Sequence, residues 1–344
     1  MPARAILPWR SSTTSHDSWQ QNIRCPMVLK LTMTCGPYDR ARALIDGSIK
    51  PEGIDLAITL NDDDVARQSQ AARGDFDVCE FFMGAYIADL PLKRLGFTAI
   101  PIFVKRMFRH SYIYINTSRG IRKPADLNGK RIGVQTWITS AALWAKGMLE
   151  EDHGVDLASI EWVAWQPVRI AGWQAPEWLK LRTAPAGSGQ FELLARGEID
   201  AGITTEIWAP GRHPDIDFLF PDHGAREREY FRRTRCFPIM HVLLIRDAVL
   251  RQNPWVARSL FDAWEASKQR LFVRQEWQRI HMTSLWYRAL WEEERAAAGD
   301  DIYPWGYAKT RHEVDAMLRY AHRQGVTPQR YQPQDLFWPS MLET

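Results

Sequence analysis

The sequence predicts an α/β protein made of two lobes. Short β-like runs are followed again and again by amphipathic stretches, which is the pattern of strands that alternate with helices. The chain has 344 residues, more than a single hydrophobic core usually contains. It has no internal repeat and no low-complexity linker, which favours two lobes that pack compactly. Ligands in such folds bind between the lobes, at the carboxyl ends of strands.

The first α/β set begins at residue 28. The turn CGPY leads from its first strand into a helix that runs through Leu44 and Ile45. A helix is also predicted in DDDVARQSQAARG (62–74), whose acidic residues stand where the helix dipole favours them. The last strand of the set, HSYIYIN, is long and alternating. The predicted strands of this set are 28–34, 54–60, 75–81, 97–103 and 110–116.

The second set starts with a turn and strand in ADLNGKRIGV. The next helix begins with the capping hydroxyl of Thr139 and carries an apolar face. AGSGQFELLARGEIDAGIT then reads as a helix, a glycine stop and a strand. A later helix has Asn253 as its cap and proline at its first position. The remaining predictions are a charged helix at 226–234, a strand at 239–247 and a mainly helical C-terminal hundred residues with a loop at 296–310.

The composition argues against a nucleic-acid-binding, membrane-spanning or disulfide-bonded protein. The formal net charge is +3 and no run of Lys or Arg tracks phosphates, so no nucleic-acid partner is predicted. No stretch approaches the roughly 18 apolar residues of a membrane span. The four cysteines are scattered without CxxC spacing, which indicates a reducing compartment rather than disulfides or structural zinc. We therefore expect a cytoplasmic protein.

Residues 1–27 are predicted to be a polar, disordered leader. They contain basic residues but no apolar segment of the kind that secretion signals carry, and Met27 is a natural start for the folded part. The chain also has 16 Trp and 10 Tyr, most of which we assign to core and interface packing. So many aromatic residues make a homo-oligomer an expectation as well.

Several segments carry a resemblance to known families. DLNGKRIGV (126–134) and GEIDAGI (197–203) resemble the second lobe of type 2 periplasmic-binding-protein folds. A larger set of segments resembles the 4,5-dihydroxyphthalate decarboxylase family, and the likeness runs from about Met27 to the C-terminus. It is weak over the Trp-rich segment 162–181, which we expect to reshape the pocket. The segments of this larger set are CGPYDRARALIDGSIKPEGIDL, FRHSYIYIN, FPDHGAREREYFRRT, FPIMH, NPWVARSL and YPWGYAKTRHEVDAMLRYAHRQGVTPQRY.

The resemblance implies a bilobal topology. Lobe one would comprise residues 28–115 plus 243–344, with the C-terminal helices as an extension, and lobe two would comprise 116–242. HSYIYIN and IMHVLLI would be the two strands that cross between the lobes. This arrangement would place His110 and His241 at the hinge, near the floor of the cleft.

The resemblance also implies an activity, the cofactor-independent decarboxylation of a hydroxylated aromatic dicarboxylic acid to a catechol-type acid. 4,5-Dihydroxyphthalate is the expected example, within aromatic-compound (phthalate) catabolism. The ring hydroxyl can supply the electrons, so the protein must hold an anionic ring, deprotonate the phenol and protonate one carbon. One alternative is a non-catalytic binding protein for a small aromatic anion on the same fold. Another is an enzyme of this fold that makes cofactor precursors.

Arg106 and Arg109 are the candidates for binding a substrate carboxylate, because Arg binds carboxylates in a bidentate way. His110 is the candidate general acid, since an ordinary histidine can carry a proton near neutral pH. Neighbours in a strand alternate faces, so Arg109 and His110 cannot both face the cleft unless the backbone bends. Arg106 is therefore the preferred arginine. Solvated arginines and a structural histidine are the alternatives.

Glu80 and His241 complete the catalytic candidates. Glu80 ends an apolar strand, where a carboxylate is costly unless it is paired or protonated, and it could take the phenol proton or orient a histidine. His241 begins a buried strand and could be a second acid/base or a structural residue. No cofactor is predicted. A divalent metal held by Glu80, His110 and His241 stays an alternative that no local ligand spacing supports.

Two strand-to-helix turns supply further substrate-binding candidates. Cys35 and Tyr38 lie at the first turn, where backbone N–H groups at a helix start can receive an anion. Trp137 and Thr139 lie at the corresponding turn of lobe two. Trp137 could stack on a ring, and Thr139 could contact a ligand or only cap its helix.

Overall fold

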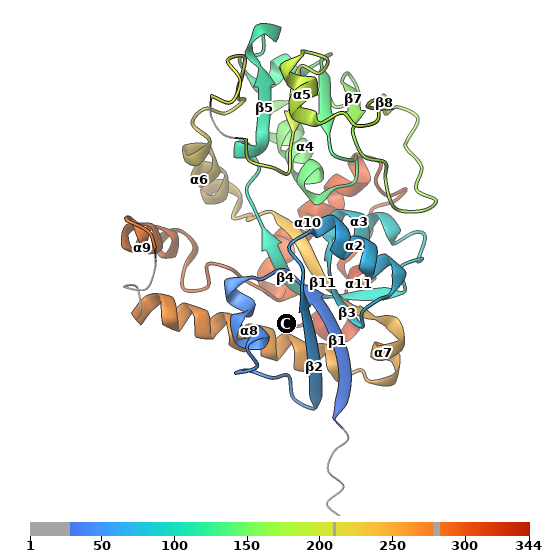
Figure 1. Cartoon of the computed structure of the whole chain (residues 1–344), viewed down its shortest axis with the longest axis vertical. Coiled ribbons are helices and arrows are strands. Elements are labelled where there is room, and N and C mark those ends of the chain that lie inside the picture. Colours follow the sequence, from blue (N-terminus) through green and yellow to red (C-terminus); the bar gives the residue numbers. More distant parts are fainter. Residues whose placement is uncertain (1–27, 209–210, 278–282) are drawn as a thin grey trace, which may run out of the picture.

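The computed structural model describes residues 28–208, 211–277 and 283–344, so the predicted leader lies outside the described residues. Two α/β lobes are stacked along the long axis of the molecule (Figure 1). We call the part around the five-stranded sheet the first lobe and the part around the six-stranded sheet the second lobe. The lobe boundaries expected at 115/116 and 242/243 stay a prediction.

The first sheet has the strand order β2-β1-β3-β11-β4. Parallel pairing joins β1 to β2 and β3, whereas β11 runs antiparallel to both β3 and β4. The inner strands β3 and β11 are buried almost throughout, which fits sequences that are apolar apart from Glu80, His241 and Arg246. The strands are β1 (Leu29–Cys35), β2 (Ile54–Leu60), β3 (Val78–Phe82), β4 (Phe97–Arg106) and β11 (Ile239–Arg246).

The second sheet has the strand order β10-β5-β9-β6-β7-β8. Its β9-β6-β7-β8 part is parallel, and β5 runs antiparallel to β9 and β10. Strands β7 and β8 begin and end the Trp-rich segment, where no strand was predicted. The strands are β5 (Ile113–Asn116), β6 (Arg131–Val134), β7 (Glu161–Ala164), β8 (Leu181–Thr183), β9 (Ala201–Ile203) and β10 (Ile216–Phe218).

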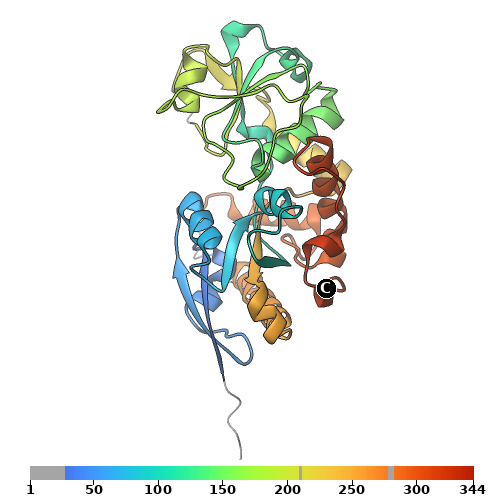
Figure 2. The ribbon, with the colours of Figure 1, turned by 90° about the vertical axis from the view of Figure 1, so that its right-hand side faces the viewer.

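Helices flank both sheets, and Figure 2 shows the C-terminal helices running beside the two lobes. Helix α10 packs against α3 of the first lobe and α4 of the second, so it ties the lobes together. The loop expected at 296–310 is shorter, because α9 ends at Ala298 and α10 begins at Tyr307. The helices are α1 (Arg42–Ile45), α2 (Asp64–Arg73), α3 (Met83–Asp89), α4 (Ser140–His153), α5 (Gln190–Ala195), α6 (His223–Thr234), α7 (Asp247–Gln252), α8 (Val256–Trp277), α9 (Tyr287–Ala298), α10 (Tyr307–Arg323) and α11 (Pro333–Leu336).

HSYIYIN and IMHVLLI were expected to cross between the lobes. In the structure the chain crosses just before β5 and just before β11. HSYIYIN is not one long strand, because His110–Tyr112 form a 3-10 turn and only Ile113–Asn116 are extended. Arg109 has helical dihedral angles (φ −119°, ψ −4°), and this bend redirects the chain from β4 to β5. The second crossing leads from α6 into β11, and Met107 N donates to Pro238 O (3.0 Å) to join the two crossings.

None of the helices in the described part of the chain has the length and apolar character required to cross a membrane.

Candidate functional site

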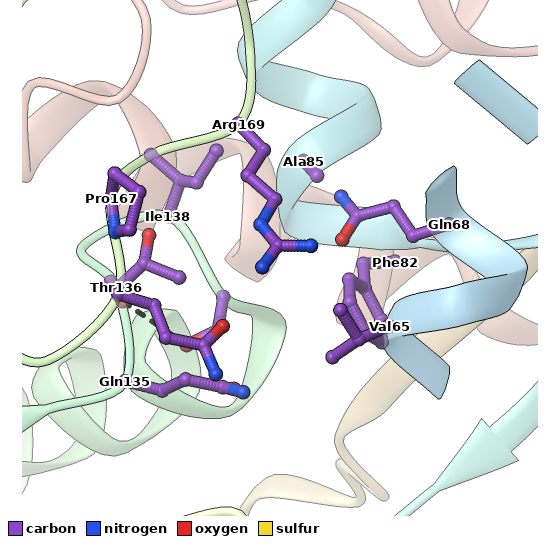
Figure 3. A pocket seen from close by; sticks show the side chains of 11 residues that line it. Val65, Gln68, Phe82, Ala85, Gln135, Thr136, Ile138, Pro167 and Arg169 are labelled. Atoms are coloured by element: carbon purple, nitrogen blue, oxygen red, sulfur yellow. Dashed lines mark hydrogen bonds between the residues drawn. The ribbon is translucent and has the colours of Figure 1, made fainter. Parts of the chain in front are cut away.

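A recess lies between the two lobes (Figure 3). Its walls combine apolar side chains with neutral amides, hydroxyls and one arginine. The first lobe supplies Val65, Gln68, Phe82 and Ala85, and the second lobe supplies Gln135, Thr136, Ile138, Thr139, Gln166, Pro167 and Arg169.

Strand-to-helix turns position these residues. Phe82 ends β3 and Ala85 lies in α3 directly after it, while residues 135–139 connect β6 to α4. The recess therefore lies at the carboxyl ends of strands from both sheets, as expected for ligand sites in open α/β folds. Thr139 caps α4 by accepting a hydrogen bond from Ala142 N (3.3 Å). It also lines the recess, so capping and ligand contact are compatible roles for this residue.

Glu80 is the centre of a polar cluster behind the first-lobe wall. Its side chain is 1% exposed and accepts hydrogen bonds from Gly36 N (2.8 Å) and Tyr38 Oη (2.6 Å). Arg67 Nη2 forms a buried ion pair with Glu80 Oε1 (3.0 Å). His241 Nδ1 is hydrogen-bonded to the same oxygen. The carboxylate is thus fully paired, which is what a buried charge requires.

Asp64 is the more exposed carboxylate of the cluster. Its Oδ2 forms an ion pair with Lys105 Nζ (2.6 Å) and lies 4.0 Å from His241 Nε2. The cluster adjoins the recess through Phe82, whose ring lies 4.7 Å from the His241 ring, centroid to centroid. Val65, which follows Asp64 in α2, lines the recess as well.

The protonation states follow from burial and charge. Burial alone would raise the pKa of Glu80, but the hydrogen bond and charge of His241, together with the charge of Arg67, lower this pKa from 4.5 to about 2. Burial lowers the pKa of His241, although Glu80 opposes that shift. At neutral pH Glu80 is therefore ionised and His241 neutral. An ionised carboxylate only accepts hydrogen bonds, so the imidazole proton is on Nδ1 and Nε2 is a base.

A divalent metal does not fit this cluster well. Asp64, Glu80 and His241 offer ligand atoms that lie within 4.8 Å of one another. However, Arg67 is paired with both carboxylates, and Lys105 is paired with Asp64. A metal ion would have to displace these cations, so we derive no chemical step through one.

The turn that follows β1 binds the Glu80 carboxylate rather than a ligand. The backbone N–H of Gly36 and the hydroxyl of Tyr38, expected to receive a ligand, both donate to Glu80. Cys35 is fully buried, and burial raises the pKa of its thiol to about 12, so it is a neutral core residue. Tyr38 thus joins the site as a partner of Glu80.

Arg106 has protein partners for its guanidinium. Nη1 forms an ion pair with Glu313 Oε1 (2.7 Å), and both side chains are almost completely buried. The guanidinium also donates to the carbonyl oxygens of Phe237 and Pro304 (2.9 Å each). Because protein groups occupy its guanidinium, we do not assign Arg106 to binding a substrate carboxylate.

His110 and Arg109 lie away from the Glu80 cluster. Both line a separate small cavity next to Tyr230, where the His110 ring packs against Phe220 and Tyr230. Arg109 is buried, donates to Thr204 O and lies over the Tyr112 ring. Burial lowers the pKa of His110 from 6.5 to about 4, assisted by the nearby positive charges. Because His110 is neutral at pH 7, it does not offer the proton expected of a general acid.

Trp137 is a core residue rather than a stacking platform. Its side chain is fully buried, and its Nε1 donates to Gln324 O (3.0 Å) at the end of α10. Lys146 Nζ lies over the indole, 3.0 Å from the ring centroid, and donates to Trp137 O (2.9 Å). The β6–α4 turn lines the recess, and these contacts of Trp137 support that turn on its buried side.

The sequence interpretation missed Asp64, Arg67, Lys105 and Arg169. The acidic run 62–64 was assigned only to helix initiation. Asp64 and Arg67 are three residues apart on α2, and their side chains form an ion pair, as helix residues at this spacing often do. Lys105 and Arg106 alternate faces on β4, and it is Lys105 that reaches the cluster. Arg169 belongs to the Trp-rich segment, where the sequence shows no pattern that could single it out.

Comparison with known proteins gives two curated relatives. The chain is 35% identical over 326 residues to a 4,5-dihydroxyphthalate decarboxylase from Comamonas testosteroni, covering 92% of this chain and 98% of the relative. It is 31% identical over 212 residues to a 4,5-dihydroxyphthalate decarboxylase from Pseudomonas putida, covering 59% and 82%. A family model described as NMT1/THI5 like matches residues 46–171.

Among solved structures, a putative periplasmic sulfonate-binding protein from Methylobacillus flagellatus is similar, with a TM-score of 0.50 and 15% identity. The similarity covers 92% of this chain and 93% of that protein. At this identity the likeness concerns the fold alone. It confirms the predicted fold class, an α/β protein of the type 2 periplasmic-binding-protein kind with C-terminal helices.

Proposed function

Because the chain belongs to the 4,5-dihydroxyphthalate decarboxylase family, we propose that it is a carboxy-lyase that removes one carboxylate from a hydroxylated aromatic dicarboxylic acid. The observation that carries this proposal is the 35% identity to such an enzyme over 98% of that enzyme's length. The polar cluster beside the recess supports the proposal, because it contains an oriented base next to a recess that combines apolar and polar side chains.

His241 is the proposed acid/base group. Glu80 fixes the imidazole through Nδ1, which leaves Nε2 without a hydrogen bond among the described residues. A ring hydroxyl that reaches Nε2 and Asp64 would lose its proton to His241. The imidazolium formed in this way is stabilised by the ionised Glu80 and by Asp64, whose pKa is also lowered by nearby positive charges despite burial.

The reaction then needs no external electron acceptor. Electron density from the phenolate enriches the ring carbon that carries the carboxylate, and this carbon takes a proton. The bond to the carboxylate breaks, its electron pair stays on the ring and carbon dioxide leaves. His241 returns its proton to the phenolate oxygen. The net reaction consumes one solvent proton for each carboxylate lost.

The recess suits a flat, anionic ring. Phe82, Val65 and Ile138 offer apolar contacts, while Gln68 and Gln135 offer amide hydrogen bonds. Small-molecule sites in proteins typically combine an apolar lining with a few polar groups of this kind.

Turnover is the direct test. The purified protein is incubated with 4,5-dihydroxyphthalate while carbon dioxide and the ring absorbance are followed, with and without prior dialysis against a chelator. We expect carbon dioxide and a dihydroxybenzoate in equal amounts, unchanged by the chelator. In D₂O the product should carry one deuterium on the ring carbon that lost the carboxylate. Tight binding with no carbon dioxide would contradict the proposal and favour the binding-protein alternative.

We also propose that the protein is located in the cytoplasm and that it self-associates. Burial raises the pKa of the three described cysteines, Cys35, Cys79 and Cys236, and none of them is in a disulfide, which suits a reducing compartment. Leu285 and Trp286, which directly precede α9, are 93% and 71% exposed, and such apolar surface suits self-association. Light scattering measures the oligomeric state, and fractionation of the host cell measures the location.

A further inference from the structure

Arg169 extends into the recess from the second lobe, between the side chains of the two walls (Figure 3). It lies in the connection between β7 and β8, within the Trp-rich segment. Gln68 and Phe82 face it from the first lobe. We propose that Arg169 is the specificity-determining residue that binds the retained carboxylate of an aromatic ortho-dicarboxylate. This inference rests on the function proposed above.

The connection that carries Arg169 is held at several points. Gln166 N donates to Gln135 O (2.9 Å), which joins it to the β6–α4 turn. Trp173 Nε1 donates to Val326 O (3.1 Å), just beyond α10. Gly172 lies so close to Arg94 of the first lobe that a Cβ there would be 3.4 Å from the guanidinium carbon. The segment therefore contacts both lobes, and these contacts position Arg169 over the recess.

The guanidinium of Arg169 is available to a ligand. Within the described part of the chain it has no ion pair and no hydrogen bond, unlike the buried Arg67 and Arg106. Among the described residues that line the recess, Arg169 alone carries a charge, and none is acidic. Thr136 Oγ1 on the same wall is buried without a hydrogen-bond partner among described residues. The second-lobe wall thus presents an unpaired bidentate cation, which is the group that best binds a carboxylate.

Electrostatics sets the orientation of the ring. Asp64, beside the first-lobe wall, has its charge balanced by Lys105 and Arg67 and can accept a hydrogen bond from a ring hydroxyl. Among the described residues that line the recess, Arg169 alone is charged, and it attracts a carboxylate. The hydroxyl edge of the ring therefore faces the cluster, and the carboxylate edge faces Arg169.

The chemistry decides which carboxylate Arg169 holds. Loss of carbon dioxide removes the negative charge of the leaving carboxylate, so an arginine paired with it would stabilise the starting state and oppose its departure. The productive arrangement pairs Arg169 with the neighbouring carboxylate, which stays on the ring. The leaving carboxylate then lies among apolar side chains such as Phe82 and Ile138, where its charge is less well solvated. A monocarboxylate has only the group that Arg169 binds, which limits the reaction to one decarboxylation.

The test uses binding instead of turnover. Calorimetry measures the dissociation constants of phthalate and benzoate, which have no hydroxyl and cannot react by the proposed route. The native protein should bind both acids, because Arg169 holds one carboxylate and each acid has one to offer. In Arg169→Gln we expect the affinity for phthalate and the affinity for benzoate each to fall by about tenfold or more, because both acids lose that bidentate partner.

Arg196→Gln is the matched control. Arg196 is also in the second lobe and loses the same charge, but it is exposed, paired with Glu198 and absent from the recess lining. This variant should keep the native affinity for both acids. Native phthalate affinity in Arg169→Gln, or a native protein that binds neither acid, would overturn the inference. Failure of turnover with Arg169-dependent binding of the two acids would instead contradict the proposed decarboxylation alone.

Discussion

His241 Nδ1 is hydrogen-bonded to Glu80 Oε1 across the antiparallel strands β11 and β3. In the sheet register His241 is opposite Phe82 and Glu80 is opposite Leu243, so the two side chains form a diagonal pair on one face. Phe82, on the same face, packs its ring against the imidazole and also lines the recess. Pairing of these two strands thus orients the base and aligns it with the wall of the recess.

Glu80→Gln should lower kcat by about a hundredfold to a thousandfold while KM changes only a few-fold. Glutamine has the same shape but no charge, so the imidazolium loses its main stabilising partner and the imidazole tautomer is no longer fixed. Steady-state kinetics on 4,5-dihydroxyphthalate checks this.

The control for this variant is Glu161→Gln, which removes a carboxylate paired with Arg182 on the surface of the second lobe. It should retain native kcat and KM. Native kcat in Glu80→Gln would remove the Glu80–His241 pair from the mechanism.

The sequence predicted Glu80 and His241 separately, because each is a polar residue in an apolar strand. Their contact spans 161 positions and depends on the pairing of β3 with β11, which local periodicity does not contain. The structure gives His110 surroundings other than the expected ones for a similar reason. Alternation predicts which way a side chain points only while the strand continues, and the bend at Arg109 ends that regularity.

The fold was more predictable than the site. β2 was predicted with its observed ends, and the α4 cap at Thr139 was identified, because both depend on neighbouring residues. Arg169 could not be predicted in this way. It lies in a connection without periodic pattern, and contacts with Arg94 and Val326, far away in the sequence, determine its position.

Arg106→Met should destabilise the protein by about 3–5 kcal/mol, because it leaves the buried Glu313 carboxylate without its cation. The folded variant should keep the native KM, since Arg106 does not line the recess. Urea unfolding gives the first quantity and steady-state kinetics the second. A KM raised by about tenfold or more would return Arg106 to the substrate-binding residues.

A second variant checks the cause of that loss. In Arg106→Met/Glu313→Gln the uncompensated charge is gone, and the glutamine oxygen can still accept the hydrogen bond that Phe237 N donates to Glu313 (2.8 Å). Most of the lost stability should return. If the double variant is as unstable as the single one, the loss reflects packing of the Arg106 side chain instead.

His110 should make the protein acid-sensitive. Its pKa is about 4 in the folded protein and 6.5 when exposed, so between these values only the unfolded chain binds the proton. The contribution is complete above pH 6.5 and is lost as the pH falls from 6.5 to below about 4, by about 3 kcal/mol in all. The charged and titratable neighbours that affect His110 are His153, His223, Arg226 and Arg233.

His110→Phe isolates this contribution. Urea unfolding at several pH values between 7 and 4 should show a stability profile that is flatter than the native one by about 2–3 kcal/mol. The matched control is His312→Phe, which alters an exposed histidine and should keep the native profile. Parallel profiles for the native protein and His110→Phe would show that His110 has the same pKa in the folded and the unfolded protein.

Gly84 is required where the lobes meet beside the recess. It is the second residue of α3, its N–H donates to Ser140 Oγ (2.9 Å), and that hydroxyl donates to Met240 O (2.6 Å). A Cβ at this position would clash with the carbonyl oxygen of Ile138 and would lie 2.9 Å from Ser140 N. Both are backbone atoms at the start of α4, so no side-chain rotation can relieve the overlap.

Gly84→Ala should therefore separate the walls of the recess and destabilise the protein by about 1–3 kcal/mol. Phthalate affinity should fall as well, because Ala85 and Ile138 on either side of the contact line the recess. Urea unfolding and calorimetry measure the two effects. Gly224→Ala in α6 is the control, since its Cβ would approach only the flexible end of Arg228. Native stability and native phthalate affinity in Gly84→Ala would mean that the lobes can move apart here without cost to the site.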